Sequence, residues 1–413
     1  MKRLALLLCL LLTLTACGGR QISASEPLPS PVPAEIAPPP ALAERNEPEP
    51  EPEPAPEPVP EPVPAPEPTP EERRAARVAE IVAGMTTEEK VGQLFFVRCA
   101  EPDMAEKVSR YHLGGVLLFG RDYKNGDNWL TEADFTAKLH AYQDAAAIPL
   151  FIGSDEEGGT VTRASRNPNL FPAKLPSPQK LYKAGGMTGL LDETRQYNER
   201  LQALGVNVNF APVADVSTDP ADFIHDRAFG QDAAATADYV AQVVDTMGKA
   251  GIGCVLKHFP GYGSNADTHT GVAIDERPRE TFEESDLLPF RAGIEAGAPF
   301  VLVSHSIVTC FDADLPASLS PAVHALLRDG LGFDGVILTD DLAMDAVNLS
   351  AVSGDVATMA LLAGNDMVVT TDFETQIPQV LAAVERGDIP AETVDAAVTR
   401  VLTAKYHLGL LGE

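Results

Sequence analysis

The chain has 413 residues, of which 45% are hydrophobic and 22% charged, so it is long and apolar enough to bury a large core. Its formal net charge of −29 at pH 7 argues against nucleic acid or an anionic membrane surface as the partner, because like charges repel. The five cysteines include no CxxC pair, so neither a zinc site nor a disulfide framework is indicated.

Residues 1–17 have the pattern of a secretory signal. Lys2 and Arg3 precede an apolar run, Leu4 to Leu14, that is short for a membrane span but typical of a signal peptide. The four residues ending at Cys17 (Leu-Thr-Ala-Cys) resemble the bacterial lipobox, whose cysteine carries lipid after cleavage. We expect lipidation of Cys17 and an extracytoplasmic protein held on the bacterial cell membrane by this anchor only. An ordinary cleaved signal peptide is the alternative.

Proline and glutamate dominate residues 18–70, and they alternate from Glu47 to Pro52. Proline fixes φ and removes a hydrogen-bond donor, and glutamates of like charge repel one another. This segment therefore cannot collapse into a core, and we expect a disordered, extended linker. It would let a folded domain reach some distance from the membrane.

Residues 71–413 have the composition of one large α/β domain. Short apolar runs predict strands at 91–97, 115–119, 150–154, 206–212, 254–258, 300–304, 336–339 and 367–370. Amphipathic patterns between them predict helices, among them 233–250, 283–296, 321–331 and 352–363. Apolar strands that alternate with helices indicate a parallel sheet, and eight such units indicate a (β/α)8 TIM-type barrel. A doubly wound open sheet is the alternative.

Polar residues follow most of these runs. In a barrel, reactive groups lie just beyond the carboxyl ends of the strands. The residues at these positions are Arg98, Arg121, Asp122, Asp155 to Glu157, Asp215, Lys257, His258, His305, Asp340 and Asp341. The sequence therefore predicts that polar side chains gather on one rim.

The segment from Lys257 to His269 combines charged residues with proline and glycine, directly after an apolar run. Asp267 and His269 stand two residues apart and could meet as a carboxylate and an imidazole. Such a pair moves protons near neutral pH, because the carboxylate orients the ring and supports its charged form. Ordinary polar loop residues are the alternative.

Three motifs in order, residues 154–163, 257–269 and 332–344, closely resemble the β-N-acetylhexosaminidase branch of glycoside hydrolase family 3. The resemblance implies a catalytic barrel over residues 71–413 that removes terminal β-linked N-acetylhexosamine (GlcNAc) with retention. Peptidoglycan fragments or other GlcNAc-ended glycans would be its substrates. We expect no cofactor, no metal ion, no nucleic-acid partner and a monomer.

The resemblance also implies roles for single residues. Asp340 falls on the nucleophile, and Asp267 and His269 fall on the acid/base dyad. The positions that hold the sugar match Asp155, Arg163, Arg227, Lys257 and His258. A retaining glycosidase needs one carboxylate to attack the anomeric carbon and a second group to protonate the departing oxygen. Here the second group would be an imidazole, an exception to the usual pair of carboxylates.

Several alternatives remain at this point. Asp341 could react in place of Asp340, although strand alternation would send neighbours to opposite faces. Arg163 and Arg227 could be partners in surface ion pairs. The activity could be that of another family 3 β-glycosidase, such as a β-glucosidase, or of a phosphorylase, since a neutral acid/base lets phosphate approach. A sugar-binding lipoprotein without turnover is the non-enzyme alternative.

Overall fold

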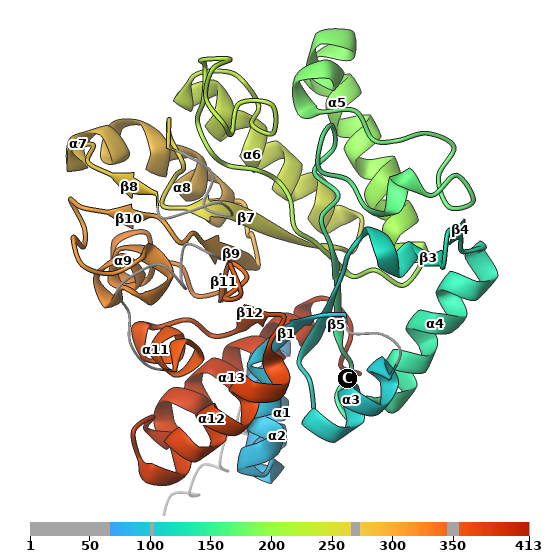
Figure 1. The fold of residues 1–413 in the computed structure, drawn as a ribbon, viewed down its shortest axis with the longest axis vertical. Coiled ribbons are helices and arrows are strands. Elements are labelled where there is room, and N and C mark those ends of the chain that lie inside the picture. The colour runs from blue at the N-terminus through green and yellow to red at the C-terminus, as the bar shows by residue number, and fades with distance from the viewer. Residues whose placement is uncertain (1–66, 100–102, 266–272, 345–354, 413) are drawn as a thin grey trace, which may run out of the picture. The chain divides into compact units, whose positions relative to one another are not determined.

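The computed structural model describes residues 67–99, 103–265, 273–344 and 355–412, which belong to a compact unit beginning at Pro66 (Figure 1). The expected signal at 1–17 and nearly all of the expected linker lie outside the described residues. The Thr69 side chain caps helix α1 by accepting the N–H of Glu72, and the Glu72 carboxylate accepts the N–H of Thr69. The first helix of the described residues therefore begins at Pro70.

Eight parallel strands form the central sheet in the order β11-β9-β7-β6-β5-β2-β1-β12. Their bounds are β1 Phe95–Arg98, β2 Gly115–Leu118, β5 Phe151–Ser154, β6 Val208–Asn209, β7 Gly253–Phe259, β9 Phe300–Val303, β11 Val336–Thr339 and β12 Val368–Thr370. A parallel bridge between Leu338 and Met367 joins the two ends of this order. The sheet closes on itself, so the predicted barrel is confirmed and the open sheet is wrong.

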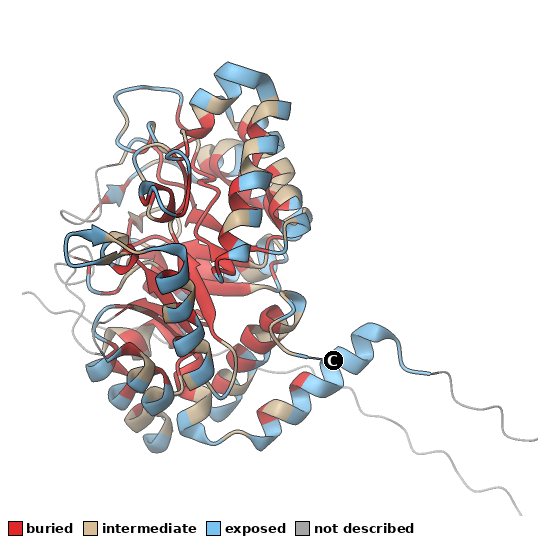
Figure 2. Ribbon diagram, turned by 90° about the vertical axis from the view of Figure 1, so that its right-hand side faces the viewer, coloured by how far each residue is buried: buried red, intermediate tan, exposed pale blue. Residues whose placement is uncertain are grey.

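Helices surround the barrel, while the strands lie in the buried centre (Figures 1 and 2). The helices are α1 Pro70–Gly84, α2 Thr87–Gln93, α3 Met104–Tyr111, α4 Glu132–Ala145, α5 Pro178–Ala203, α6 Ala233–Lys249, α7 Arg279–Thr281, α8 Leu287–Glu295, α9 Pro321–Ala325, α11 Val356–Ala363, α12 Phe373–Arg386 and α13 Ala391–His407. Two π-helical turns, η3 Phe282–Asp286 and η5 Leu326–Gly330, continue α7 and α9. The four predicted helices thus correspond to α6, η3 with α8, α9 with η5, and α11; residues 352–354 of the last lie outside the described residues.

The strand predicted at 91–97 begins too early. Residues Thr87–Gln93 form helix α2, and β1 starts only at Phe95. Thr86 caps this helix and Glu89 completes a capping box, which is a local signal for a helix start. Val91 and Leu94 are both buried. A buried helix end and a buried strand have similar apolar runs, so the run alone did not reveal the boundary.

Short elements in the connections complete the fold. They are the antiparallel pair β3 Lys124–Asn125 and β4 Asn128–Trp129, the parallel pair β8 Ile274–Asp275 and β10 Ile307–Val308, and the 3-10 turns η1 Gly120–Tyr123, η2 Ala164–Arg166 and η4 Ala317–Leu319. The connections after β2 and β5 are joined by the Asn167 side chain, whose Nδ2 donates to the carbonyl of Leu130 at 2.9 Å. These two loops therefore form one continuous wall at the carboxyl end of the barrel.

Aromatic rings fill the inside of the barrel. The ring of Phe96 stacks on Phe151 and meets Phe210 edge-on, with centroids 6.1 and 5.2 Å away. A Cβ at Gly153 would lie only 2.7 Å from the Phe96 ring and 2.8 Å from that of Phe210, so the glycine makes room for both. Val401 and Ala404 of α13 belong to the same cluster. The interior of the barrel is thus filled by a packed core.

Candidate active site

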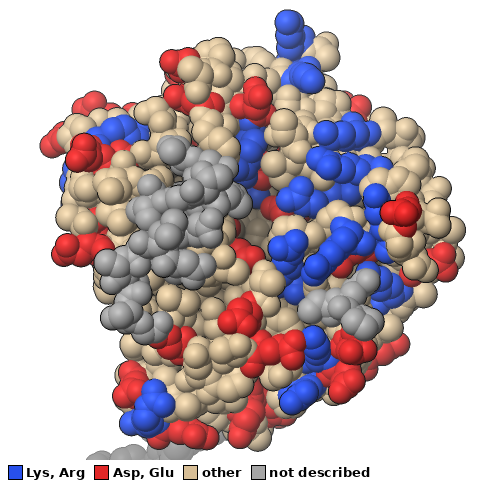
Figure 3. Space-filling view, in the orientation of Figure 1, with Lys and Arg blue, Asp and Glu red and all other residues tan. Residues whose placement is uncertain are grey.

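A cavity of about 440 Å³ opens at the carboxyl ends of the strands, and Figure 3 shows it as a hollow near the centre of this face. Its walls carry Asp155, Arg163, Arg227, Lys257, His258 and Asp340. These are all the predicted site residues that lie in the described part of the chain. The side chains of Phe210 and Leu302, which project into the barrel, contribute to the lining as well. Three distant sequence motifs therefore meet at one hollow.

Lys257 lies at the centre of a buried network of charges. Its Nζ donates to Asp155 Oδ1 at 2.8 Å and lies 2.6 Å from Glu157 Oε1. Arg227 reaches the same Glu157 through two parallel bonds, Nε to Oε2 at 2.9 Å and Nη2 to Oε1 at 2.8 Å. The exposed fractions are 4% for the Lys257 side chain and 1% for Glu157. This bidentate pairing fixes both cations in position beside the cavity.

Electrostatics keeps this network ionised. Burial acts to raise the pKa of Glu157, but the charges of Arg227 and Lys257 outweigh it and hold the pKa well below the usual value. Burial likewise acts to lower the pKa of Lys257, yet Asp155 and Glu157 together raise it above that of an exposed lysine. A protonated Lys257 is therefore available as a hydrogen-bond donor to a ligand hydroxyl.

His258 is oriented by Asp215. Its Nδ1 lies 2.8 Å from Asp215 Oδ2, and its Nε2 lies 3.1 Å from Arg227 Nη2. Arginine can only donate, so these contacts fit a neutral ring that donates from Nδ1 and accepts at Nε2. Asp215 Oδ1 also accepts the backbone N–H of Tyr262 at 2.8 Å. One buried carboxylate thus positions both the imidazole and the start of the following loop.

Asp340 and Asp341 both line the cavity, because β11 ends at Thr339 and neither residue lies within the strand. The predicted separation to opposite faces is therefore wrong. Asp341 is engaged by the connection after β12, since its Oδ2 accepts from Thr371 Oγ1 at 2.9 Å. Asp340 Oδ1 accepts the N–H of Asp341 at 2.8 Å. The Asp341 carbonyl in turn lies 3.0 Å from Nε2 of the buried His305. The turn that carries both aspartates is thus held from two sides.

Arg163 is placed by Glu156. The Glu156 carboxylate accepts the N–H groups of Arg163 at 2.9 Å and Ala164 at 2.8 Å, and it also bonds Ser165 Oγ. The Arg163 guanidinium lies 3.5 Å from Asp155. With exposed side-chain fractions of 23% for Arg163 and 13% for Arg227, neither is a surface ion-pair partner. That alternative is wrong for both residues.

Asp267 and His269 lie outside the described residues, so their expected pairing stays a prediction. The two ends of their loop are joined by Asn265, whose Nδ2 donates to Asp275 Oδ2 at 2.7 Å. Arg277 bonds Asp275 at 2.8 Å and Asp286 at 3.1 Å, and a Cβ at Gly263 would collide with the Arg277 guanidinium. The described stem of the loop is therefore firmly held.

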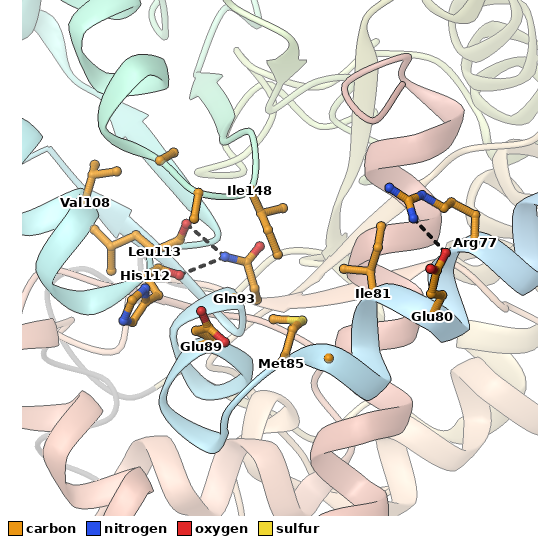
Figure 4. A pocket seen from close by; sticks show the side chains of 13 residues that line it. Arg77, Glu80, Ile81, Met85, Glu89, Gln93, Val108, His112, Leu113 and Ile148 are labelled. Carbon is orange, nitrogen blue, oxygen red and sulfur yellow. Dashed lines mark hydrogen bonds and ion pairs between the residues drawn. The ribbon is translucent and has the colours of Figure 1, made fainter. Parts of the chain in front are cut away.

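Two further cavities lie at the opposite end of the barrel. One, of about 320 Å³, lies among α1, α2 and α3 and is lined by apolar side chains such as Ile81, Val108 and Ile148, with Gln93 bonded to the His112 and Leu113 carbonyls (Figure 4). The other, of about 770 Å³, lies among α6, α8 and α13. Neither contains any of the predicted site residues, so the site belongs to the carboxyl end of the strands.

A single protein family accounts for the three motifs and for the cavity where they meet. Residues 86–404 match the Glycosyl hydrolase family 3 N terminal domain. The chain belongs to this family. Membership in family 3 confirms the resemblance of the three motifs, and it makes the chain a glycoside hydrolase.

Relatives within family 3 agree over most of the chain. Beta-hexosaminidase LpqI of Mycobacterium tuberculosis is 32% identical over 345 residues, covering 81% of this chain and 86% of that protein. The solved structure of M. tuberculosis LpqI superposes with a TM-score of 0.71 at 30% identity, covering 79% and 96% of the two chains. A family 3 β-N-acetylglucosaminidase from Paenibacillus sp. str. FPU-7 gives a TM-score of 0.74 at 31% identity, covering 80% of this chain and 64% of that one.

Sequence reasoning missed two site residues, Glu157 and Asp215. Both were placed on the rim after their strands, but neither was given a role. Lys257, Arg227 and His258 were predicted at one site, and buried cations need carboxylate partners. This need could have pointed to Glu157 and Asp215.

Within the described ranges, no three His, Cys, Asp or Glu side chains are grouped as a metal site requires. None of the described helices is long and apolar enough to cross a membrane.

Proposed function

We propose that this family 3 enzyme releases terminal β-linked N-acetylglucosamine from the ends of glycans, with retention of configuration. The observation that carries the proposal is the convergence of Asp340 with Asp155, Lys257 and the Arg227–Glu157 pair at one cavity. The cavity is closed at its base by the packed barrel interior, so it can hold the terminal sugar of a glycan better than a sugar within the glycan. Relatives named β-hexosaminidase and β-N-acetylglucosaminidase support the choice of sugar.

The proposed steps use the roles that the resemblance to family 3 implies for Asp340, His269 and Asp267, of which the structure describes only Asp340. Asp340 attacks the anomeric carbon while the glycosidic oxygen departs with a proton from His269, which Asp267 orients. In the second step His269 removes a proton from water, the oxygen of this water bonds to the anomeric carbon, and Asp340 leaves. Asp155 accepts hydrogen bonds from sugar hydroxyls, and Lys257 and Arg163 donate to them. The N–H of Asp341 helps to hold the attacking carboxylate in place.

The experiment compares 4-nitrophenyl β-N-acetylglucosaminide with 4-nitrophenyl β-glucoside, each with and without phosphate. We expect rapid turnover of the first substrate only and no glycosyl phosphate among the products. Proton NMR during the reaction should show β-N-acetylglucosamine as the first sugar released, as retention requires. Preference for the glucoside, or formation of sugar 1-phosphate, would reject the proposal.

We further propose that the protein acts outside the cytoplasm as a monomer, anchored to the bacterial cell membrane by lipid on Cys17, and that it degrades peptidoglycan fragments. The charged start, the short apolar run and the small residues before Cys17 support the anchor. Cys17→Ser should move the full-length chain from the membrane fraction to the soluble or secreted fraction. Unchanged membrane retention would contradict the lipid anchor, and light scattering of detergent-solubilised protein would reveal any oligomer.

A further inference from the structure

A buried histidine lies next to the turn that carries Asp340 and Asp341. His305 follows β9 at the carboxyl end of the barrel, and β9 pairs with β11, which leads into that turn (Figure 1). His305 is fully buried, and among the described residues it is not one of those that line the catalytic cavity. It therefore does not contact a ligand in this cavity, and it can take part in the reaction only through its neighbours.

The two ring nitrogens of His305 have different partners. Nε2 lies 3.0 Å from the carbonyl oxygen of Asp341, and Nδ1 lies 2.7 Å from Ser318 Oγ. A carbonyl oxygen only accepts, so the first contact requires the proton on Nε2. The Ser318 hydroxyl can then donate to Nδ1, which satisfies a neutral ring at both nitrogens. The serine thus selects the tautomer that holds the Asp341 carbonyl.

The position of Ser318 is fixed by backbone hydrogen bonds. The N–H of Ser318 donates to the Ser304 carbonyl at 2.9 Å, and the N–H of Ala317 donates to the Ser306 carbonyl at 2.8 Å. From the connection between α11 and β12, Asn365 Nδ2 donates to the Ser318 carbonyl at 2.8 Å. These bonds hold the serine hydroxyl and the imidazole in place relative to each other before a ligand enters.

The contact with His305 reaches the nucleophile through the backbone. The Asp341 carbonyl also accepts the N–H of Met344 at 2.9 Å, so two donors fix this peptide group. The N–H of Asp341 donates to Asp340 Oδ1 at 2.8 Å, while the N–H of Asp340 donates to the Val303 carbonyl at 3.0 Å. Rotation of the Asp341 backbone would move its N–H away from the carboxylate, and the contact with His305 opposes this rotation.

We propose that His305 is a positioning residue for the nucleophile and that Ser318 keeps it in the required tautomer. This inference rests on the proposed function, in which Asp340 attacks the anomeric carbon. The attacking carboxylate must be held close to its line of attack, because a misplacement of about 1 Å can cost about 100-fold in rate. A core histidine with a packing role only is the alternative, and its loss would lower stability without slowing the attack.

Three changes separate the hydrogen bonds from the packing. His305→Phe keeps a ring of similar size and removes both nitrogens, and we expect kcat to fall about 100-fold. His305→Gln keeps a donor near the position of Nε2, so its kcat should stay within about tenfold of that of the unaltered enzyme. Ser318→Ala leaves the imidazole but frees its tautomer, and kcat should fall by about threefold to tenfold.

Sugar binding is measured beside turnover, with the 4-nitrophenyl glycoside that the enzyme hydrolyses and with the released sugar as inhibitor. Asp155 and Lys257 hold the sugar in the proposed function, so the inhibition constant should stay nearly unchanged while kcat falls. His324→Phe is the matched control. His324 is 2% exposed, and its Nδ1 lies 2.8 Å from the Ser320 carbonyl at the start of α9. This variant should change the melting temperature but keep kcat.

Trapping of the covalent intermediate measures the attack by itself. In a glycosyl fluoride of the same sugar with a second fluorine at C5, an oxygen of Asp340 bonds to the anomeric carbon as fluoride leaves. The second fluorine slows hydrolysis of this intermediate, and fluoride departs with little help from a general acid. The rate at which mass spectrometry of the intact protein detects the adduct should fall in His305→Phe and be largely restored in His305→Gln.

Normal kcat and trapping rates in His305→Phe, with only the melting temperature lowered, would overturn the proposal. Equal losses in His305→Phe and His305→Gln would do the same, because the donor would then have no effect. If His305→Phe does not fold, Ser318→Ala decides, and rates equal to those of the unaltered enzyme would reject the proposal. Failure of the proposed function would appear separately, as preference for the β-glucoside, and the same variants would then be compared on that substrate.

Discussion

At the scale of single residues, Glu157 is the shared partner of the two buried cations of the site. Its carboxylate receives Lys257 at 2.6 Å and the fork of Arg227, and 1% of its side chain is exposed. A buried charge without its counter-ion is costly, so the two cations depend on this one acid. Asp155 assists Lys257 but does not bond Arg227. The geometry of the sugar site therefore depends on a residue that is not itself expected to contact the reacting atoms.

Glu157→Gln should accordingly destabilise the fold. The change keeps the shape but removes the charge that compensates Arg227 and Lys257, and we expect a loss of about 3 kcal/mol in the free energy of unfolding. Urea denaturation of the variant and the unaltered protein measures the difference. Glu199→Gln, which breaks an exposed pair with Arg195, is the control and should cost less than about 1 kcal/mol. Equal effects of the two changes would show that the buried charge is not needed.

Asp340 and Asp341 are adjacent, and the structure gives them different surroundings. Asp340→Ala should lower kcat by about 10³-fold or more while leaving the circular dichroism spectrum and the melting temperature nearly unchanged, because the nucleophile is lost. Asp341→Asn should cost about tenfold or less, since the carboxylate of Asp341 bonds Thr371 and the N–H of Ala343. A larger loss in Asp341→Asn than in Asp340→Ala would reverse the assignment.

At the scale of elements, α13 and α2 close the amino-terminal end of the barrel around a buried amine. Lys405 is fully buried; its Nζ donates to Gln93 Oε1 at 2.6 Å and lies 5.1 Å from the centroid of the Phe151 ring. No carboxylate of the described part of the chain pairs with it. Burial therefore lowers the pKa of Lys405 well below that of an exposed lysine. This helix contact becomes more favourable as the amine loses its proton.

The stability of the protein should consequently depend on pH. Because burial lowers the pKa of Lys405 in the folded chain, the unfolded chain binds more protons at pH values between the two pKa values, and raising the pH through this interval favours folding by up to about 1.4 kcal/mol for each pH unit. Between about pH 7 and 8.5, few other groups with shifted pKa values titrate. In this range the unfolding free energy should rise, and Lys405→Met should flatten the rise. Chemical denaturation at several pH values measures both slopes, and identical slopes would refute the role of the buried amine.

At the scale of the whole molecule, the described barrel has its own continuous core. The unit that begins at Pro66 is bounded by α1, whose Val78 and Val82 are buried in the main cluster. A protein shortened to residues 67–413 should therefore melt within about 2 °C of the full chain, because no described core residue is lost. A further cut to Thr86 removes α1 and should lower the melting temperature clearly. Calorimetry compares the three chains, and a large effect of the first cut would contradict an independent domain.

The sequence was sufficient for the architecture because that information is local. The apolar runs and helical patterns determined that strands and helices alternate, and the three motifs pointed to Asp155, Lys257, His258 and Asp340, which the structure brings together at one cavity. Boundaries were less certain. Residues 91–93 looked like the start of a strand, although the capping box at Thr86 assigns them to a helix.

Only the tertiary structure decided which charges are partners. Arg227 bonds Glu157 across 70 residues of sequence, and Lys257 bonds Asp155 across 102. No local pattern encodes these pairs, because they arise when parallel strands close into a barrel and bring their carboxyl ends to one rim. The same closure places Arg98 and Arg163 on the lining of one cavity. The sequence by itself determined the elements and the kinds of residue at their ends, and the closed sheet decided which of them meet.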